Sequence, residues 1–438
     1  MKVVDNAIFE KALAVIEKIF PLHRSISGDG INQAFEYLDN EVDGRLIRYP
    51  TGEQVFDWLI PQEWVCNDVS ICALDESGES VDEIVIFDHP LRVASHSCNV
   101  NDVFKGKALK KKLVCLKKYP DNLSHRYIYY REDWSISVKK SEYEKIEDGR
   151  NYLVKIASEK KDGDLKVHEY SLEGEKKETI FLLSHLCHPA QFNDGLIGVL
   201  LNLYLYNYIK KNYTQTKYTY KFLAFPETIG SHAYCSNPSN IENALFAIFS
   251  EMTALDQPIH VQKSKNDADY VNSLIELAAK ECSLEAKFSP FLKVIRNDEK
   301  VFNAPGINIP AASITRAWGY GNHDDHPYFG YHTDLDDIDS ADFEKLKEVL
   351  TLYQTMVFIL ENDCVVERKF DGIPMLSRHN LFVDPLQDRV GYNIRESLVW
   401  QLSENSKLST IALNLEVPFS YLLNILTDWE SEGLVVLN

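Results

Sequence analysis

The sequence has no long hydrophobic run, and its basic residues are outnumbered by acidic ones. No segment approaches the ~20 consecutive apolar residues that a membrane-spanning helix needs. Charged residues such as Asp5, Glu10 and Lys11 interrupt the apolar positions of residues 1–20, so we expect no secretory signal peptide there. Lysine plus arginine total 46 against 66 aspartate plus glutamate, a net charge of -20, which disfavours binding to nucleic-acid phosphates and anionic membranes.

The patterns of several common protein classes are also absent. The eight cysteines are scattered without C-x-x-C pairs, which argues against a disulfide scaffold and favours reduced thiols. No G-x-S-x-G motif is present, which disfavours a serine hydrolase of that type, and the isolated glycines do not form a phosphate-binding loop. We therefore expect a cytoplasmic protein that uses neither disulfides nor a serine nucleophile in that motif.

The apolar residues that are present suffice for several packed domains. Hydrophobic residues make up 45% of the 438 positions, a length that predicts two or three domains. Apolar residues at helical spacing predict helices over residues 4–20 and 31–38. From residue 55 to about residue 116, short alternating runs separated by polar turns predict a small β-rich module.

Strand-like and helical segments alternate beyond Tyr152. The apolar runs TIFLLSH, YTYKFLAF and ALFAIFS are separated by helical segments, one of them running from Leu196 to Lys211. This alternation predicts an α/β fold with a mixed, mostly parallel sheet and helices on both faces. Near the C-terminus the order becomes three helices and a short strand, which is the order of a winged helix-turn-helix.

Three domains are therefore predicted. Residues 1–54 and 119–370 form a discontinuous α/β domain, residues 55–118 an inserted small β-rich domain, and residues 385–438 a winged helix-turn-helix domain. The helices of the last domain carry acidic residues where a DNA reader needs arginine or lysine. We accordingly favour a protein-contact or structural role for that domain.

The segment LLSHLCHPAQFNDGLIGV holds the densest candidate site. A buried strand ends in His185, His188 follows shortly after, and Asp194 precedes the next helix. Sites in α/β proteins form at the carboxyl edge of parallel strands, and imidazole and carboxylate groups are common zinc ligands. The alternative is that the histidines are ordinary core or capping groups and that Asp194 is a helix cap.

Three further residues of ligand type each follow a strand-like run. Glu227 follows FLAFP, Glu251 follows FAIFS, and His332 lies in FGYHTDLDDID. Buried carboxylates are costly unless a cation pairs with them. The convergence of several such residues on one sheet edge therefore predicts a metal site.

The motifs NDGLIG, PETIGS, SEM and YHTDLDDID, in this order, resemble those of the aminopeptidase-type zinc exopeptidases, which include secreted bacterial aminopeptidases and glutaminyl cyclases. This resemblance covers about residues 150–360 and is most specific at YHTDLDDID. SHLCHP, WLIPQEW and DGIPMLSRHNL look still more like a bacterial group of aminopeptidase-like proteins with an inserted β-module and a C-terminal winged helix. That second likeness extends over nearly the whole chain.

The resemblance implies a site for one or two zinc ions. Asp194 would bridge two ions, Glu227 and Glu251 would be terminal ligands, and His332 would bind the second ion. Either His185 or His188 would be the remaining histidine ligand, with the other orienting its partner.

The sequence departs from the family pattern at two places. The usual pair of adjacent glutamates is reduced to Pro226-Glu227, and the S-G at the helix start is Ile197-Gly198. Either Glu227 is the catalytic base at a one-zinc site, or Glu227 is a ligand and another group is the base.

Polar residues on nearby loops are candidates for a substitute base or for substrate binding. They are Asp298, Glu299, His323, Asp324, Asp325 and His326. Arg24 is a candidate to hold a substrate carboxylate through two parallel hydrogen bonds, the alternative being a surface arginine beside a helix cap. Cys187 is interpreted as a buried thiol.

The favoured hypothesis is a zinc-dependent, aminopeptidase-like hydrolase that cleaves an amide bond of a short peptide or aminoacyl substrate by metal-activated water. One alternative is a catalytically inactive metal-binding scaffold or regulator that contacts partners through the winged helix. Another is a zinc deacylase of a modified sugar or amino acid. We expect neither nucleic acid nor membrane as a partner and leave a homo-oligomer open.

Overall fold

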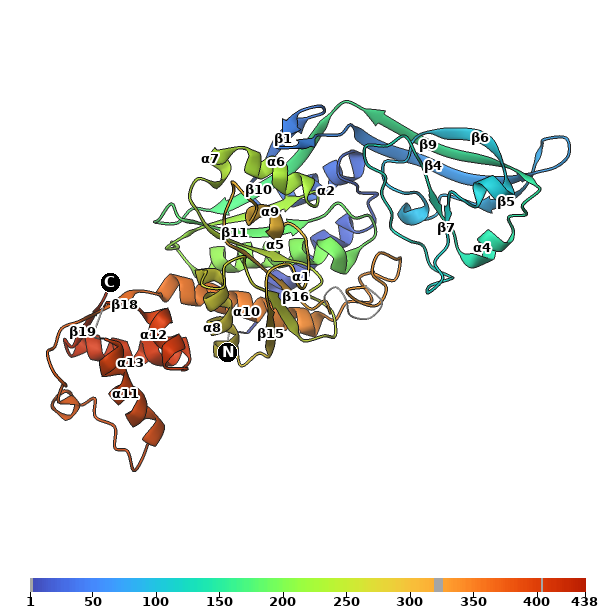
Figure 1. The fold of residues 1–438 in the computed structure, drawn as a ribbon. Helices are drawn as coiled ribbons and strands as arrows, with labels where there is room; N and C mark the ends of the chain where they lie inside the picture. The colour runs from blue at the N-terminus through green and yellow to red at the C-terminus, as the bar shows by residue number, and fades with distance from the viewer. Residues whose placement is uncertain (1–2, 319–325, 403–404) are drawn as a thin grey trace. The chain divides into compact units, whose positions relative to one another are not determined.

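The structure is a computed structural model that describes residues 3–318, 326–402 and 405–438 (Figure 1). The chain divides into two compact units. The larger unit contains residues 5–265 and 287–347. The smaller unit contains residues 266–286 and 348–438 together with the start of the chain.

A sheet of eight strands is the centre of the fold, in the order β1-β10-β12-β11-β13-β16-β14-β15. The strands are β1 (Gly44–Pro50), β10 (Asp164–Leu172), β12 (Thr219–Phe225), β11 (Thr179–His185), β13 (Ala244–Ser250), β16 (Ala311–Thr315), β14 (Ile259–Gln262) and β15 (Ala286–Ser289). The four strands β12, β11, β13 and β16 run parallel, whereas β1 pairs antiparallel with β10, β10 with β12, and β14 with β16. The predicted α/β fold with a mixed sheet is confirmed.

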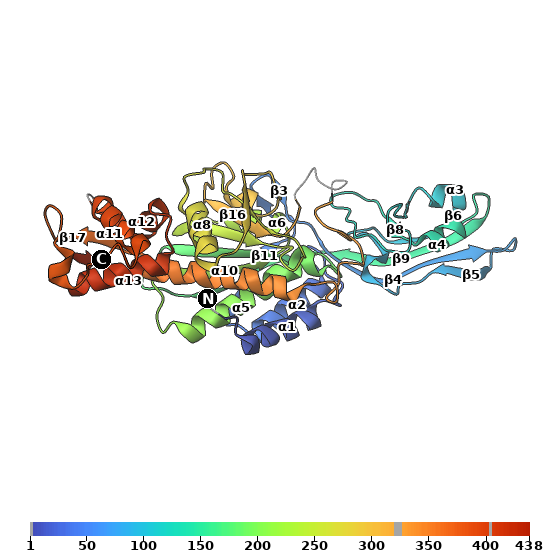
Figure 2. The ribbon, with the colours of Figure 1, turned by 90° about the horizontal axis from the view of Figure 1, so that it is seen from below.

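The central strands are buried because their sequences are continuously apolar. All seven residues of β11 are buried, as are six of the seven residues of β12. Helices shield the two faces of the sheet, as parallel strands require. Figure 2 shows α1 (Asn6–Ile19), α2 (Asp29–Asp39) and α5 (Ile197–Asn212) on one side and α6 (Ile229–Ser236) on the other. The next four α-helices along the chain are α7 (Pro238–Ile241), α8 (Tyr270–Cys282), α9 (Glu299–Phe302) and α10 (Phe343–Asn362).

A separate four-stranded antiparallel sheet, in the order β5-β4-β9-β6, forms the β-rich module of the larger unit. Its strands are β4 (Glu63–Leu74), β5 (Ser80–Val85), β6 (Val100–Lys105) and β9 (Asn151–Lys161). One apolar core, which includes Val69, Ile71, Val154 and Ile156, packs beneath it. The short elements around this sheet are β2 (Gln54–Val55), β3 (Trp58–Leu59), α3 (Gly106–Leu109), β7 (Leu113–Val114), β8 (Ile136–Ser137) and α4 (Lys140–Glu144).

The extent of this sheet differs from the range 55–118 predicted for the inserted domain. Strand β9 pairs with both β4 and β6, so the sheet takes in residues up to Lys161. The reason lies in its side chains: Tyr152, Val154 and Ile156 are buried on one face, whereas alternate residues remain accessible. The predicted domain boundaries are not otherwise tested and stay predictions.

In the described residues after α10, the smaller unit contains three α-helices and three short strands. They are α11 (Arg389–Gln401), α12 (Leu408–Asn414), α13 (Phe419–Ser431), β17 (Val365–Arg368), β18 (Ser406–Lys407) and β19 (Val435–Leu437). Asp363 accepts hydrogen bonds from the N–H and hydroxyl of Ser409, and Glu281 accepts one from the N–H of Ser420. The winged-helix assignment of residues 385–438 stays a prediction. Among the described residues, no helix is both long and apolar enough to span a bilayer.

Candidate metal centre

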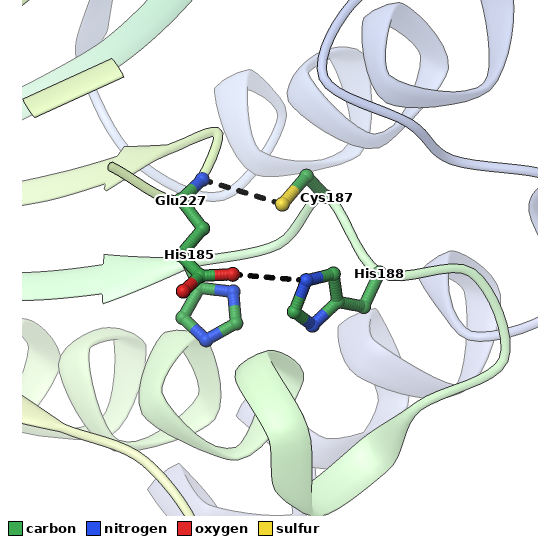
Figure 3. A group of neighbouring side chains, drawn as sticks. All are labelled: His185, Cys187, His188 and Glu227. Atoms are coloured by element: carbon green, nitrogen blue, oxygen red, sulfur yellow. Dashed lines mark hydrogen bonds and ion pairs between the residues drawn. The ribbon is translucent and has the colours of Figure 1, made fainter. Parts of the chain in front are cut away.

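The first histidines of the candidate site stand at the end of the central strand β11 and in the turn after it. His185 is the last residue of β11 and is fully buried, and His188 is 5% exposed. Cys187 lies between them, and its sulfur accepts a hydrogen bond from the N–H of Glu227 at 3.3 Å (Figure 3).

The turn that carries Asp194 leaves the helical conformation before α5 begins. Asp194 has φ -86° and ψ 76°, and Gly195 has φ 120° and ψ -67°. A side chain at Gly195 would meet the ring and the carbonyl oxygen of His185 at 3.0 Å, so both the positive φ and the close approach require glycine. This irregular turn lets the Asp194 carboxylate point at the histidines instead of capping the helix.

The two glutamates follow the neighbouring strands. Glu227 comes two residues after β12, and its side chain is 31% exposed. Glu251 directly follows β13 and is 1% exposed. Of these two carboxylates, Glu227 is therefore the one that solvent or a substrate can reach.

His332 lies in a loop that reaches the same cluster, and it contacts His125, a histidine that the sequence motifs did not indicate. The carbonyl oxygen of His332 accepts a hydrogen bond from the N–H of His125 at 2.8 Å, and Ser124 and Thr333 form a β-bridge beside it. The ring of His125 lies 5.0 Å from that of His332 and 4.7 Å from that of His188. His125 lies between β7 and β8 within the β-rich module, away from the α/β strands in sequence, so strand-end patterns could not indicate it.

The structure brings all six predicted ligand residues into one cluster. Distances of 3.6 Å and 2.9 Å separate Nε2 of His185 from Oδ1 of Asp194 and Oε2 of Glu251. Oδ2 of Asp194 lies 3.3 Å from Nδ1 of His188 and 2.7 Å from Nε2 of His332. Nε2 of His188 lies 3.0 Å from Oε2 of Glu227 (Figure 3).

Three groups within the described residues have ligand atoms close enough together for a metal ion. They are His185, Cys187, His188 and Glu227; His125, His188 and His332; and His185, Asp194 and Glu251. His185 and His188, the two alternatives for the first histidine ligand, therefore each belong to at least one of these groups.

The electrostatics of the cluster favour a positive charge at its centre. Burial opposes protonation of both imidazoles, yet Asp194 raises the pKa of His188 well above its usual value, and Cys187 and Glu251 do the same for the pKa of His185. Burial raises the pKa of the Asp194 carboxyl, but His188 and then His332 bring it well below the usual range. A metal ion bound here would supply the positive charge that these carboxylates attract, and it would displace the protons from the two imidazoles.

Polar residues behind the cluster hold the carboxylates in place. The side-chain amide of Asn297 donates to Glu251 at 2.9 Å. Asp336 accepts hydrogen bonds from the N–H groups of Asn193 and Asp194 at 2.9 and 3.0 Å, and burial raises the pKa of Asp336 to about 6. Asp336 lies four residues after His332 in YHTDLDDID, so that spacing was the available signal for its role.

Arg24 was predicted to bind substrate, and this prediction is wrong. Its side chain is fully buried, and its guanidinium donates to the carbonyl oxygens of Leu186 at 2.8 Å and His188 at 2.5 Å. Further bonds go to the carbonyl oxygens of Ile19 and Phe20. Arg24 therefore anchors the turn that carries His188 to the end of α1.

The other predicted substrate-binding residues have different outcomes. Asp298 is buried and accepts hydrogen bonds from the N–H of Thr228 and the hydroxyl of Ser231 at 2.8 and 2.5 Å, so it supports the loop after Glu227 and does not face substrate. His326 packs its ring 6.4 Å from that of Tyr331, at a loop position, and its role in binding stays a prediction. His323, Asp324 and Asp325 lie outside the described residues.

Glu299, the remaining loop candidate for the base, is buried behind Glu251. It accepts hydrogen bonds from the side-chain amide of Gln262 and from the N–H of Asn297. Burial, followed by the charge of Glu251, raises the pKa of Glu299 to about 8. Its position does not give it access to a substrate.

Comparison with known proteins gives a consistent result. The family described as a domain of unknown function, DUF4910, matches residues 13–363. A Clostridium acetobutylicum protein, named for polysaccharide biosynthesis with an aminopeptidase-like domain, is 30% identical over 353 residues, which cover 80% of this chain and 77% of that protein.

Solved structures extend the similarity to the fold. A Clostridium acetobutylicum protein named as a peptidase has a TM-score of 0.82 at 26% identity, covering 98% of this chain and 96% of that one. A zinc aminopeptidase from Bacillus subtilis has a TM-score of 0.58 at 12% identity, covering 80% of this chain and 93% of that one. The chain therefore belongs to the DUF4910 family and has the fold of the aminopeptidase-type zinc exopeptidases, as the sequence motifs indicated.

Proposed function

We propose that this protein is a zinc-dependent, aminopeptidase-like hydrolase that cleaves an amide bond of a short substrate. The observation that carries this proposal is the position of Asp194, whose two oxygens face different partners. Oδ1 faces His185, and Oδ2 faces His188 and His332. A carboxylate placed in this way can bridge two metal ions, and the structural relatives with this fold include zinc aminopeptidases.

The residues fit such ions by their unused hydrogen-bonding capacity. Within the described part of the chain, Nδ1 of His185 and Nε2 of His125 are buried without a hydrogen-bond partner, and Oδ2 of Asp194 lies beside Nδ1 of His188 and Nε2 of His332 without a well-oriented hydrogen bond to either. Such orphaned atoms are costly unless a cation or water meets them. Imidazole and carboxylate donors in this number suit zinc.

Two overlapping ligand sets follow from the geometry. His185, Asp194 and Glu251 would hold one ion, and Asp194, His188 and His332 would hold a second, with His125 beside it. Bound zinc supplies a water of lowered pKa and polarises the carbonyl of the amide.

Glu227 is the proposed base. Burial raises its pKa, but the hydrogen bond and charge of His188 outweigh this and lower the pKa to about 2, so the carboxylate is ionised at neutral pH. Because Glu227 is partly exposed beside the cluster, it can accept a proton from an attacking water and pass it to the leaving amine. Asp298 would act only indirectly, by fixing the backbone after Glu227.

The proposal is tested with purified, zinc-loaded protein and a panel of aminoacyl amides and N-acyl amino acids. We expect turnover, with Glu227→Gln lowering kcat by about 10²–10⁴-fold while zinc remains bound. His332→Ala should lower zinc content measured by atomic emission. Glu344→Gln, at an 81% exposed position, is the matched control. Full activity of both site variants, or no turnover by the zinc-loaded wild type, would reject the proposal.

A second candidate is deacylation of a modified sugar by the same residues. It is favoured by the name of the Clostridium acetobutylicum relative, which refers to polysaccharide biosynthesis. Release of acetate from N-acetylated sugars, compared with release of amine from aminoacyl amides, distinguishes the two. An inactive scaffold that uses residues 385–438 for partner contacts predicts zinc binding without turnover in either assay.

A further inference from the structure

A cavity of about 270 Å³ opens directly beside the cluster in the larger unit. It reaches His188 and Glu227 at one end, and it is lined by aromatic rings that include Trp58, Tyr127 and Tyr129. An apolar cavity of ~150 Å³ accepts benzene. This cavity therefore has room for one ring with a short polar extension next to the proposed reaction centre.

The aromatic wall is held in place by its own contacts. The rings of Tyr127 and Tyr129 stack with their centroids 4.8 Å apart and their planes 17° apart. The hydroxyl of Tyr130 donates to the carbonyl oxygen of Leu59 at 2.6 Å, and the Trp58 ring lies 4.7 Å from that of His232. Rings fixed in this way offer a preorganised surface for another ring.

The charges along the cavity are unequal. Lys300 contributes an ammonium group, whose Nζ donates to the carbonyl oxygen of Arg296 at 2.7 Å. Among the described residues that line the cavity, Glu227 is the sole carboxylate, and it faces His188 at the proposed reaction centre, at 3.0 Å. A positively charged amine elsewhere in the cavity would be repelled by Lys300, whereas an anion would be attracted to it.

We propose that this cavity selects amides whose ring-bearing group carries a negative charge, such as a carboxylate. This inference rests on the proposed hydrolase function and specifies its substrate class. The ring would pack on the tyrosine wall, the anion would face Lys300, and the amide carbonyl would lie toward His188 and Glu227. An aminoacyl amide with a free ammonium group would then be a poor substrate.

Binding is measured first with ligands that cannot be hydrolysed, so that the result does not depend on catalysis. Calorimetry on the zinc-loaded protein compares 3-phenylpropionate, 3-phenylpropanol and phenethylamine, which share a ring and differ in charge. Glucuronate, glucose and glucosamine form the same series on a sugar ring. We expect the anion to bind about two- to fivefold more tightly than the neutral ligand, and the series with the larger affinities identifies the ring.

Charge reversal at the cavity supplies the decisive comparison. Lys300→Glu should reverse the preference, so that the amine binds more tightly than the carboxylate, whereas Lys177→Glu at an exposed control position should leave it unchanged. Tyr127→Ala should weaken all ligands of the preferred ring series regardless of charge. Its control is Phe382→Ala, since both side chains are 54% exposed.

The outcomes separate this inference from the hydrolase proposal. If the anion binds no more tightly than the amine, or if Lys300→Glu keeps the preference for the anion, the inference is wrong. If the charge preference holds but no anionic or neutral amide is hydrolysed, the cavity assignment stands as a binding site and the hydrolase proposal fails.

Discussion

Replacing Arg24 tests how the ligand-bearing turn is held. In Arg24→Met the apolar stem stays, but the buried carbonyl oxygens of Leu186 and His188 lose their donors. Leaving a buried acceptor unsatisfied costs about 1–3 kcal/mol, so two such acceptors predict a loss of about 2–6 kcal/mol in the free energy of unfolding. The carbonyl oxygens of Ile19 and Phe20 also accept hydrogen bonds from Arg24, but they lie at the end of α1, and the loss of about 2–6 kcal/mol includes no contribution from them.

The same change should weaken metal binding, because the turn that Arg24 holds carries His188. Losing support behind a ligand lowers metal affinity by about 10–100-fold. Urea unfolding followed by circular dichroism gives the first quantity, and zinc titration against a chelator of known affinity gives the second. Arg24→Lys should recover only part of either loss, because one ammonium nitrogen cannot reach all the carbonyl oxygens that Nε, Nη1 and Nη2 of the guanidinium reach at once.

Arg48→Met is the matched control. Arg48 is 55% exposed and pairs with Asp164 at 3.1 Å, so its replacement should change stability by less than about 1 kcal/mol. The reasoning about Arg24 is refuted if Arg24→Met and Arg48→Met are equally stable and bind zinc equally well.

Two further predictions concern packing and pH. A side chain at Gly198 would meet the carbonyl oxygen of Ser250 at 2.2 Å. Gly198→Ala should therefore push α5 away from β13, displace Glu251 and lower the free energy of unfolding by about 1–3 kcal/mol. An unchanged melting temperature would contradict this prediction. Burial lowers the pKa of His96 to about 3, from an ordinary value of 6.5. The imidazole of His96 therefore binds a proton more readily in the unfolded chain than in the folded one. The contribution of neutral His96 to stability is complete above pH 6.5 and is lost as the pH falls toward 3, by an amount on the order of a few kcal/mol. His96→Asn, which suits the φ of 66°, should reduce this acid dependence in urea midpoints measured between pH 7 and 4, and equal slopes would speak against it.

The strand-end residues could be predicted from sequence because their positions follow from one rule of α/β folds. His185 and Glu251 end or follow neighbouring parallel strands, whose carboxyl ends meet at the same sheet edge. A linear pattern of apolar runs followed by ligand-type residues therefore sufficed to group them. Asp194 needed no further information, since it lies in the turn between β11 and α5.

His125 could not be found in this way because tertiary contacts alone bring it to the site. Its backbone is tied to His332, which is more than 200 residues away, by one hydrogen bond and an adjacent bridge. The sequence around Arg24 did not indicate its burial either, because two of the carbonyl oxygens that it binds belong to Leu186 and His188, more than 160 positions away.

The sheet to which β9 belongs did have a signal in the sequence. NYLVKIASEKK alternates apolar and polar residues, which is typical of a strand with one accessible face, whereas TIFLLSH is continuously apolar. Applying that distinction would have moved the boundary of the β-rich module beyond residue 118.

Residues 124–130 form one loop that contributes both to the cluster of candidate ligands and to the wall of the cavity. The start of this loop places His125 beside the cluster of candidate metal ligands, and Tyr127, Tyr129 and Tyr130 line the cavity. Substitutions at residues 126–130 would therefore alter the wall of the cavity without altering the ligand-type residues that follow the strands. Conversely, a protein without this loop would lack both the imidazole beside the cluster and the tyrosines that line the cavity.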